Sequence, residues 1–560
     1  MSDVSMDPPP ATKPLSGDAP GATGTLQHRM LENPKETWER CWVWASERAN
    51  PIVVKEVRQS LKSKQFTFAF GATLLAAIGW TVLAVSLGVP RIYYVPSGAT
   101  LLVGYLCILI LPLMVIIPFS AFRSLTAETE DSTFELLSIS ALSATQIVHG
   151  KMASALVQIV LYLSAIAPCI VLTYLLRGVS IFTILFVLGL TFTFSVSEAA
   201  LALLFAAIGR TRMVQNAASV VMLTALLLAG FGWLSFVLSG VLDEISSLPR
   251  EVYLVLFGVG TIVVTAVSLV LHAAAAAIDF PAENHSTKLR LRILALVTLV
   301  FFWTLFAAIA TEEAEALMVM LIFLFIFMMS IGALMTGEYG VISPRAQRTL
   351  PKTFFGRIFL TWLYPGAGLG YIFVVSIFAA MASTLAIAEV YYSASLRNWF
   401  GNDSVMVAGY VLTCYLIIYL GLNRLVLLCL PSSLPAKMVG SFALMAVILL
   451  FAHLVPLLVV FYLNGYREFD YGWHQAFNIF WTTNEALRNS FRSTAFQGVP
   501  SQIRTTMIIV TLSAIGVFGL NLLMCTRDVL LVRVAEPKRV REDKGLEDDT
   551  DKSTEDPFAE

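Results

Sequence analysis

Apolar runs of about twenty residues recur along this chain from Phe68 to Met524, separated by short polar breaks. A helix needs about 20 residues to cross roughly 30 Å of hydrocarbon, so each run is long enough to span a membrane. The 560-residue sequence is 57% hydrophobic and only 13% charged. Because such a chain cannot cover itself with polar side chains, it is predicted to be an all-α polytopic membrane protein.

The polar breaks predict about twelve spans and a division into five regions. The spans lie near 68–89, 100–121, 152–175, 181–208, 214–240, 252–278, 291–311, 316–335, 366–391, 405–429, 438–463 and 506–525. The regions are a disordered cytoplasmic tail (1–37), an interfacial amphipathic segment (38–66), a six-span unit (67–278), a second six-span bundle (279–525) and a cytoplasmic C-terminal tail (526–560).

Basic residues are distributed unevenly between the short loops. If the N-terminus is cytoplasmic, the inner loops hold Arg123, Lys151, Arg210, Arg212, Lys288, Arg290, Arg292, Arg345, Arg348, Lys352, Arg357, Arg424 and Lys437. The outer loops hold only Arg91, Arg177, Arg250 and Arg397. Because basic residues favour the cytoplasmic side, both termini are predicted to be cytoplasmic. The longer connection over residues 464–505 departs from this pattern with four arginines, Arg467, Arg488, Arg492 and Arg504.

A basic amphipathic segment, NPIVVKEVRQSLKSKQF, precedes the first span at residues 50–66. At 100° per residue, one arc of a helix here contains Val53, Val54, Val57 and Leu61, and another contains Lys55, Arg58 and Lys62. Pro51 suits the first turn of this helix. Such a helix is typical of a membrane interface, with its basic arc against lipid phosphates or an acidic partner. Ordinary positive charge flanking a first span is the simpler alternative.

The cytoplasmic connection between the second and third spans, residues 123–151, is longer than two packed helices require. Its candidate contact residues are Glu128, Glu130, Phe134, Glu135, Leu136 and Leu137. The carboxylates can pair with basic groups of a partner, and the apolar side chains can fill a cleft in it. Ser143 stands where a helix N-cap belongs. The pattern therefore predicts a short helix below the membrane.

Together, these two segments resemble the type-two ABC transporter permease family. In its pattern an acidic residue is followed by Gly-Thr-Leu-Glu-Leu-Leu, then Leu-Ser, then Gly-Lys. The matching residues here, in order, are Thr133, Glu135, Leu136, Leu137, Leu142, Ser143, Gly150 and Lys151. Ser132 and Phe134 depart from the pattern, standing where the family usually has Gly and Leu. The resemblance covers roughly half of the chain.

The resemblance implies a connecting helix before the first span, a coupling helix within residues 123–151 and a six-span permease domain. It also implies a location in a bacterial plasma membrane, an export function and a separate ABC ATPase subunit that binds ATP and Mg. Membrane lipids and a second permease copy are further expected partners. The second bundle is either a fused permease domain, with residues 338–357 in place of the coupling loop, or an appended bundle. That loop repeats neither Glu-Leu-Leu nor Gly-Lys.

Several motifs are missing from the sequence, and their absence narrows the function. No Walker P-loop occurs, so the chain itself is not expected to hydrolyse ATP or to be an enzyme. Neither a metal-ligand cluster nor a catalytic Ser/His/Asp, Cys/His or dinucleotide-binding pattern is present, and the six cysteines are scattered singly. We therefore predict no catalytic, cofactor or metal site in this chain. The net charge of −1 gives no indication of a nucleic-acid partner.

Two other classes of function remain open on the sequence. A secondary transporter driven by an ion gradient needs ionisable groups at membrane depth, and Glu198 in the fourth span is the main candidate. Glu198 either lies on a substrate path or makes a structural hydrogen bond between helices. A non-transporting membrane scaffold would share the hydropathy but would not need the coupling-loop pattern.

The charge distribution gives a direct prediction of topology. Single cysteines introduced at Gly21, Asp243 and Asp548 should differ in their access to a membrane-impermeant thiol reagent, and only the one at Asp243 should react from outside. Labelling at either tail position in intact cells would contradict this orientation.

Overall fold

The computed structural model describes residues 51–130, 143–208, 212–241, 250–279, 284–311, 315–338, 360–391, 404–430, 437–463, 465, 471–490 and 501–531. The predicted N-terminal tail, the interfacial residues 38–50, and the coupling residues Phe134, Glu135, Leu136 and Leu137 lie outside these ranges. So do residues 532–560 of the predicted C-terminal tail, whereas its first six residues, 526–531, continue the last helix. Regular structure in the described part is helical throughout.

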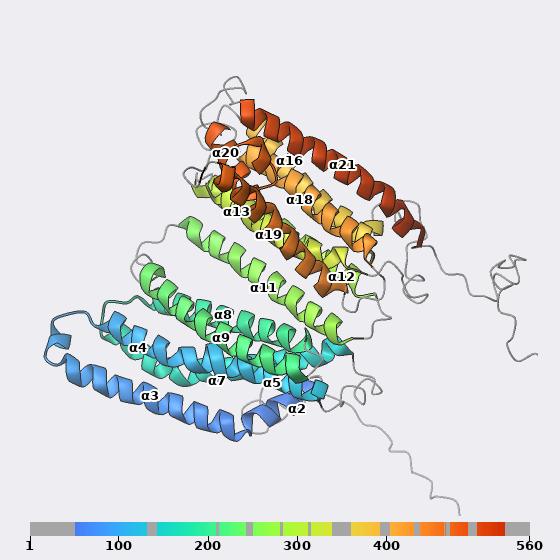
Figure 1. Ribbon diagram of the computed structural model, residues 1–560. Helices are drawn as coiled ribbons and strands as arrows, with labels where there is room; N and C mark the ends of the chain where they lie inside the picture. Colours follow the sequence, from blue (N-terminus) through green and yellow to red (C-terminus); the bar gives the residue numbers. More distant parts are fainter. Residues whose placement is uncertain are drawn as a thin grey trace, which may run out of the picture.

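The first half of the chain forms a bundle (Figure 1). Its main helices are α2 (Pro51–Leu61), α3 (Lys64–Gly88), α4 (Gly98–Ile110), α5 (Ile117–Glu130), α7 (Ala144–Leu175), α8 (Ile181–Ile208), α9 (Arg212–Phe236) and α11 (Arg250–Ile278). A π-helical turn, η2 (Leu111–Ile116), joins α4 to α5, so these three elements form the second span. Short elements η1 (Arg91–Tyr93) and η3 (Val237–Val241) complete this half.

The second half contains α12 (Ser286–Thr311), α13 (Glu315–Thr336), α16 (Ala367–Tyr391), α18 (Ser404–Cys429), α19 (Lys437–Leu463), α20 (Ile479–Ser490) and α21 (Ser501–Leu531). Two 3-10 turns, η5 (Thr361–Leu363) and η6 (Trp473–Gln475), precede α16 and α20.

Twelve helical stretches in the described ranges are long and apolar enough to cross a membrane, which confirms the predicted all-α polytopic fold. The ends of several spans differ from the predicted ones. The first span begins at Lys64 because the Ser63 side chain accepts a hydrogen bond from the Phe66 N–H at 3.1 Å and caps the helix. The last span begins at Ser501, five residues before the predicted start.

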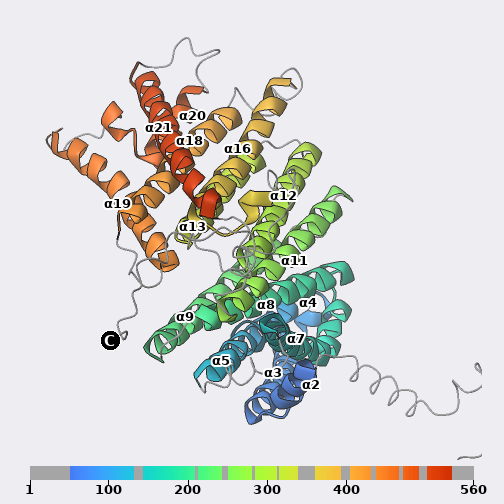
Figure 2. The ribbon, with the colours of Figure 1, turned by 90° about the vertical axis from the view of Figure 1, so that its right-hand side faces the viewer.

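Two hydrophobic cores fill the molecule, and α11 contributes to both. Leu271, Ala274 and Ala275 belong to the core of the first half. Leu269, two residues before Leu271 and so about 200° around the helix from it, belongs to the core of the second half, and Ile262 and Ala266 pack against that core. Figures 1 and 2 show α11 lying between the two groups of helices.

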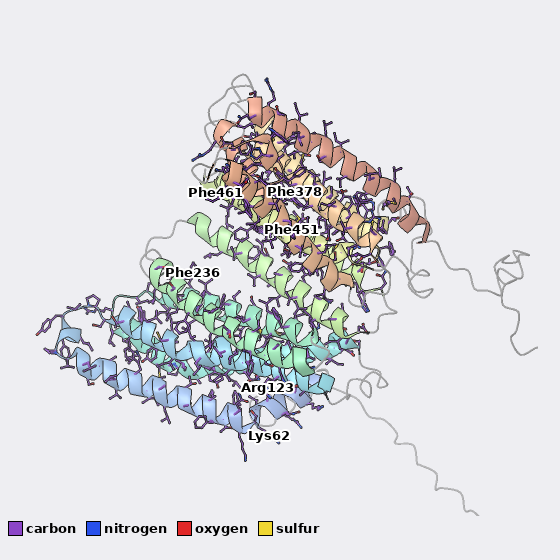
Figure 3. The ribbon with its side chains drawn as sticks, in the orientation of Figure 1. Lys62, Arg123, Phe236, Phe378, Phe451 and Phe461 are labelled. Atoms are coloured by element: carbon purple, nitrogen blue, oxygen red, sulfur yellow. The ribbon has the colours of Figure 1, made fainter. Side chains whose placement is uncertain are left out.

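Because consecutive spans run antiparallel, one end of the molecule holds the starts of the odd-numbered spans and the ends of the even-numbered ones. We call it the α2 end. Figure 3 shows Lys62 and Arg123 at this end and Phe236 at the opposite one. The predicted topology places the α2 end in the cytoplasm.

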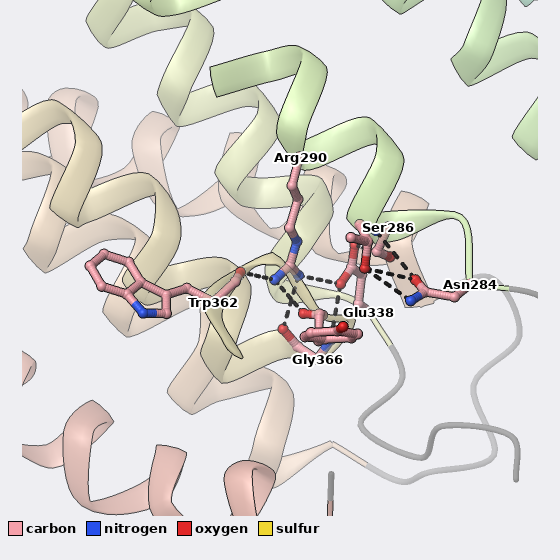
Figure 4. A network of polar contacts seen from close by, with 8 residues as sticks. Asn284, Ser286, Arg290, Glu338, Trp362 and Gly366 are labelled. Carbon is pink, nitrogen blue, oxygen red and sulfur yellow. Dashed lines mark hydrogen bonds and ion pairs between the residues drawn. The ribbon is translucent and has the colours of Figure 1, made fainter. Parts of the chain in front are cut away.

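Arg290, in the first turns of α12, has a fully buried side chain at the α2 end of the second half (Figure 4). Its Nη1 donates to the Trp362 carbonyl at 2.7 Å and the Tyr364 carbonyl at 2.5 Å, and its Nη2 reaches Glu338 Oε2 at 2.5 Å. The same carboxylate accepts from the Gly366 N–H at 3.1 Å. Arg290 therefore ties α12 to the end of α13 and to the turn before α16.

A second polar cluster lies deeper in the same half. Asn423 of α18 donates to Thr336 of α13 and to Ser441 of α19, both at 2.9 Å, and all three side chains are buried. The next residue, Arg424, is also buried and donates to Asn521 of α21 at 3.0 and 3.1 Å. Arg290 and Arg424 are thus buried structural residues and not the inner-loop charges predicted from the sequence.

Part of the arginine-bearing connection after α19 folds into the second half. Tyr415 and Tyr419 of α18 donate from their hydroxyls to the carbonyls of Ala476 and Phe477. Tyr415 lies eleven residues into α18, about 16 Å along the helix from its first residue. Gln475 is fully buried there. The segment over residues 471–490 is therefore packed against a span and is not simply part of an outer loop, as its position in the sequence predicts.

The Arg290 network predicts a strong effect of breaking one partner only. Arg290→Met should lower the unfolding free energy by about 3 kcal/mol or more, because it leaves Glu338, whose side chain is 8% exposed, as an unpaired buried carboxylate. Adding Glu338→Gln should recover part of the loss. Thermal unfolding of the detergent-purified protein measures both, with the exposed Arg58→Met as control. Equal unfolding temperatures for Arg290→Met and Arg58→Met would contradict this account.

Candidate functional site at the docking of helix α2

The amphipathic segment before the first span does form a helix, α2, with Pro51 as its first residue. Val53, Val54 and Val57 are half-buried, whereas Lys55 and Arg58 are exposed, as the two arcs predict. The helix ends at Leu61, so Lys62 lies just beyond it and the segment is not one continuous helix to residue 66. The break arises because Ser63 caps the next helix instead.

Lys151 of α7 joins three elements at the α2 end. Its side chain is 2% exposed, and its Nζ lies 2.9 Å from Glu128 Oε1 on α5 and 3.6 Å from Glu56 Oε1 on α2. The ammonium also donates to Ser124 Oγ at 2.7 Å. One buried cation is therefore shared by the helix before the first span, the end of the second span and the start of the third.

A second polar contact lies one turn further along the same interface. Ser154 Oγ of α7 donates to Ser60 Oγ of α2 at 3.0 Å. Ser154 follows Lys151 by three residues, and Ser60 follows Glu56 by four, so each pair faces the same way on its helix. Together the contacts fix both the position and the register of α2 on α7.

The electrostatics of this site depend on all three charges remaining together. Glu56 and Glu128 have side chains that are 13% and 20% exposed, so both are largely removed from solvent, and the ammonium of Lys151 is almost completely removed. A buried charge of this kind is tolerated only when it is paired and hydrogen-bonded. Movement of α5 or of α2 relative to α7 would separate these charges, so the three elements are expected to move as one body.

Ser143 begins α7 as the predicted N-cap, and this prediction is confirmed. Its hydroxyl accepts from the Gln146 N–H, and the Gln146 side chain accepts from the Ser143 N–H at 3.0 Å, which forms a complete capping box. Gly150 is buried in the second turn of the same helix.

The connection between the second and third spans is shorter than the predicted loop over residues 123–151. Residues 123–130 continue the second span as α5, and residues 144–151 are already part of α7. Glu128 therefore faces Lys151 of its own chain. The side chain of Glu130 and the whole of residues 131–142, where the predicted coupling helix falls, lie outside the described residues.

Glu198 is the other predicted site residue, and the structure buries it in the middle of the first bundle. Its side chain in α8 is 5% exposed, and neither carboxyl oxygen has a hydrogen-bond partner among the described residues. Three residues earlier, Ser195 Oγ donates to the Leu113 carbonyl of the π-helical turn η2 at 2.6 Å. The described contacts thus give no structural hydrogen bond to Glu198. π-Helical turns are frequent at functional sites.

Sequence reasoning identified Lys151 but missed Glu56, Ser60 and Ser154. The signal was available, since Glu56 stands among basic neighbours on an amphipathic helix and Ser154 follows Lys151 by one turn. What the sequence lacks is the long-range register that brings residues nearly a hundred positions apart into contact.

The Lys151 site predicts a large difference between two single substitutions. Lys151→Met should destabilise the protein by about 3–5 kcal/mol, because it leaves two carboxylates facing each other without a cation. Lys55→Met, on the exposed face of α2, should change stability by less than about 0.5 kcal/mol. Unfolding in detergent compares them, and equal stability of the two variants would exclude a structural role for Lys151.

Glu198 gives a prediction of opposite sign for stability and activity. Glu198→Leu should keep or raise thermal stability, since it removes a buried polar group without a described partner. If Glu198 lies on the substrate path of an ATP-driven permease, the same substitution should abolish transport, and Glu198→Gln, which keeps a polar side chain, should retain part of it. Normal transport by Glu198→Leu would remove Glu198 from the mechanism.

Comparison of the chain with protein-family models, with curated proteins and with solved structures finds no match. The resemblance to type-two ABC permeases therefore stays a prediction from the sequence. The structure itself shows a multi-pass membrane protein by the length and composition of its twelve apolar helices.

Proposed function

We propose that this chain is the permease subunit of an ATP-driven transporter, an exporter whose ATPase is a separate polypeptide. The observation that carries the proposal is the Lys151 site. It links an amphipathic surface helix to the two spans on either side of the predicted coupling segment. If α2 served only to anchor the chain at the membrane surface, it would not need a buried ion pair with the second and third spans.

The link offers a route for mechanical force. A partner ATPase that binds residues 131–142 would transmit force to the end of α5 and the start of α7, because these helices border that segment. Since Lys151 ties both helices to α2, force applied there is shared by the second span, the third span and the surface helix. The second and third spans then move together relative to α8, where the buried Glu198 lies.

The proposal is tested first at the predicted coupling segment. Phe134→Ala plus Leu137→Ala should release a co-purifying ATPase, because loss of buried interface anchors typically costs about 2 kcal/mol or more each. Glu130→Gln plus Asp131→Asn, which removes charge but no apolar anchor, should have a much smaller effect. Glu128 is left intact in both variants because it holds Lys151.

Both variants must first be shown to insert and to unfold at the wild-type temperature. Retention of the ATPase and of substrate-stimulated ATP hydrolysis by the apolar double variant would exclude this segment as the coupling element. A requirement for the anchors, with the charge variant unaffected, would support the permease assignment.

One observation favours a second candidate, transport driven by an ion gradient. Proton-coupled carriers require an ionisable group within their membrane-spanning part, and Glu198 is such a group. Neither of its carboxyl oxygens has a hydrogen-bond partner among the described residues. The two mechanisms separate in reconstituted vesicles. Transport by this chain alone, driven by a pH gradient and lost in Glu198→Gln, would establish the second candidate and exclude the first.

A further inference from the structure

A cluster of basic side chains lies where the two halves of the molecule meet, apart from the Lys151 site. It consists of His149 on α7, His272 on α11, and Lys288 and Arg292 on α12. The ring centroids of His149 and His272 are 5.5 Å apart, and Arg292 Nη2 lies 2.6 Å from His272 Nε2. His149 and Lys288 both interact electrostatically with His272.

The hydrogen bonds of the cluster hold its guanidinium in place. Because His272 Nδ1 bonds to the Ser268 carbonyl at 2.8 Å, it carries the proton, and Nε2 is left to accept from Arg292. Arg292 also donates to Ser268 Oγ at 3.4 Å and to the Lys288 carbonyl at 3.3 Å. The neutral imidazole therefore orients Arg292 without neutralising it.

The cluster has positive charge that the described residues do not balance. The ion pairs among those residues include neither Lys288 nor Arg292, and Asp279, near the end of α11, lies 3.8 Å from His285 instead. The positive charge of the cluster therefore comes from the side chains of Lys288 and Arg292, while the N-terminal ends of α7 and α12 and the C-terminal end of α11 lie more than one turn from the residues that carry the two imidazoles and the guanidinium. An anion is the ligand that such an arrangement attracts.

The position of the cluster indicates what kind of anion. Each of its helices begins or ends within two turns of the cluster. If these helices span a bilayer, the cluster is expected at the depth of the lipid headgroups at the α2 end. Beside Arg292, an exposed stripe of α12 runs toward the membrane centre through Leu291, Ala295 and Phe302, with Leu291 56% and Phe302 57% exposed. An acyl chain can lie along this stripe, whereas free phosphate gains nothing from it.

We propose that His149, His272, Lys288 and Arg292 bind the phosphate group of an anionic phospholipid in the leaflet at the α2 end. Arg292 and Lys288 supply the charge, His272 positions Arg292, and His149 closes the site from the first bundle. The lipid would contact both halves of the chain at their junction. This inference does not depend on the proposed transport function.

The test measures lipid binding by the purified full-length protein. Phosphatidylglycerol added to detergent solution should be retained in native mass spectra and should raise the unfolding temperature more than phosphatidylcholine does. Lys288→Gln plus Arg292→Gln should weaken phosphatidylglycerol binding by about fivefold for each charge removed. Arg504→Gln removes one charge from an exposed side chain at the end of the molecule opposite the α2 end and should leave binding unchanged.

Arg292→Lys keeps the charge and guards against a simple folding defect, and it should retain most of the binding. Inorganic phosphate is the competing probe. Competition by inorganic phosphate as effective as that by phosphatidylglycerol would show a free-anion site and overturn the lipid assignment. Equal binding of the two lipids, or wild-type binding by the double variant, would overturn the site itself.

Discussion

The burial of charge in a molecule surrounded by hydrocarbon is the constraint on which the rest of this structure depends. Lys151, Arg290 and Arg424 are all almost completely buried, and each is held by oxygen atoms from other helices or from the turns that join them. Lipid supplies no hydrophobic force between helices, so van der Waals packing and such polar contacts determine how the spans associate. The three cations therefore specify which helix ends lie together.

Each half of the molecule contains a buried ion pair at the α2 end. In the first, a lysine at the start of the third span meets a carboxylate at the end of the second, Glu128. In the second, an arginine at the start of the seventh span meets a carboxylate just after the eighth, Glu338. In each half a carboxylate thus stands at the base of the connection between that half's second and third spans. The cation comes from the third span of the first half but from the first span of the second half. The two ion pairs therefore use the same kind of interaction at the same end of the molecule, but they do not show that the second half repeats the first.

The fold could be predicted from the sequence where a single local property determines it. Hydropathy located twelve spans, helical periodicity located α2, and the residue preference for helix caps located Ser143. Long-range contacts could not be predicted in this way. Arg290 and Arg424 look like loop charges when only the charge pattern is considered, and their burial depends on partners 48 to 97 residues away. The docking of residues 471–490 on α18 likewise rests on carbonyl contacts that leave no mark in composition.

Helix α11 has one face in each core, and this has a consequence for how the protein is made. When α11 enters the membrane during synthesis, Leu269 and its neighbours have only lipid beside them until α12 and α13 follow. Lipid tolerates an apolar face, so this intermediate incurs little penalty, but it gains none of the packing that holds the finished helix. The other helices of the first half should thus pack together before the position of α11 is fixed. Insertion of the second half then fixes α11 by packing against its other face.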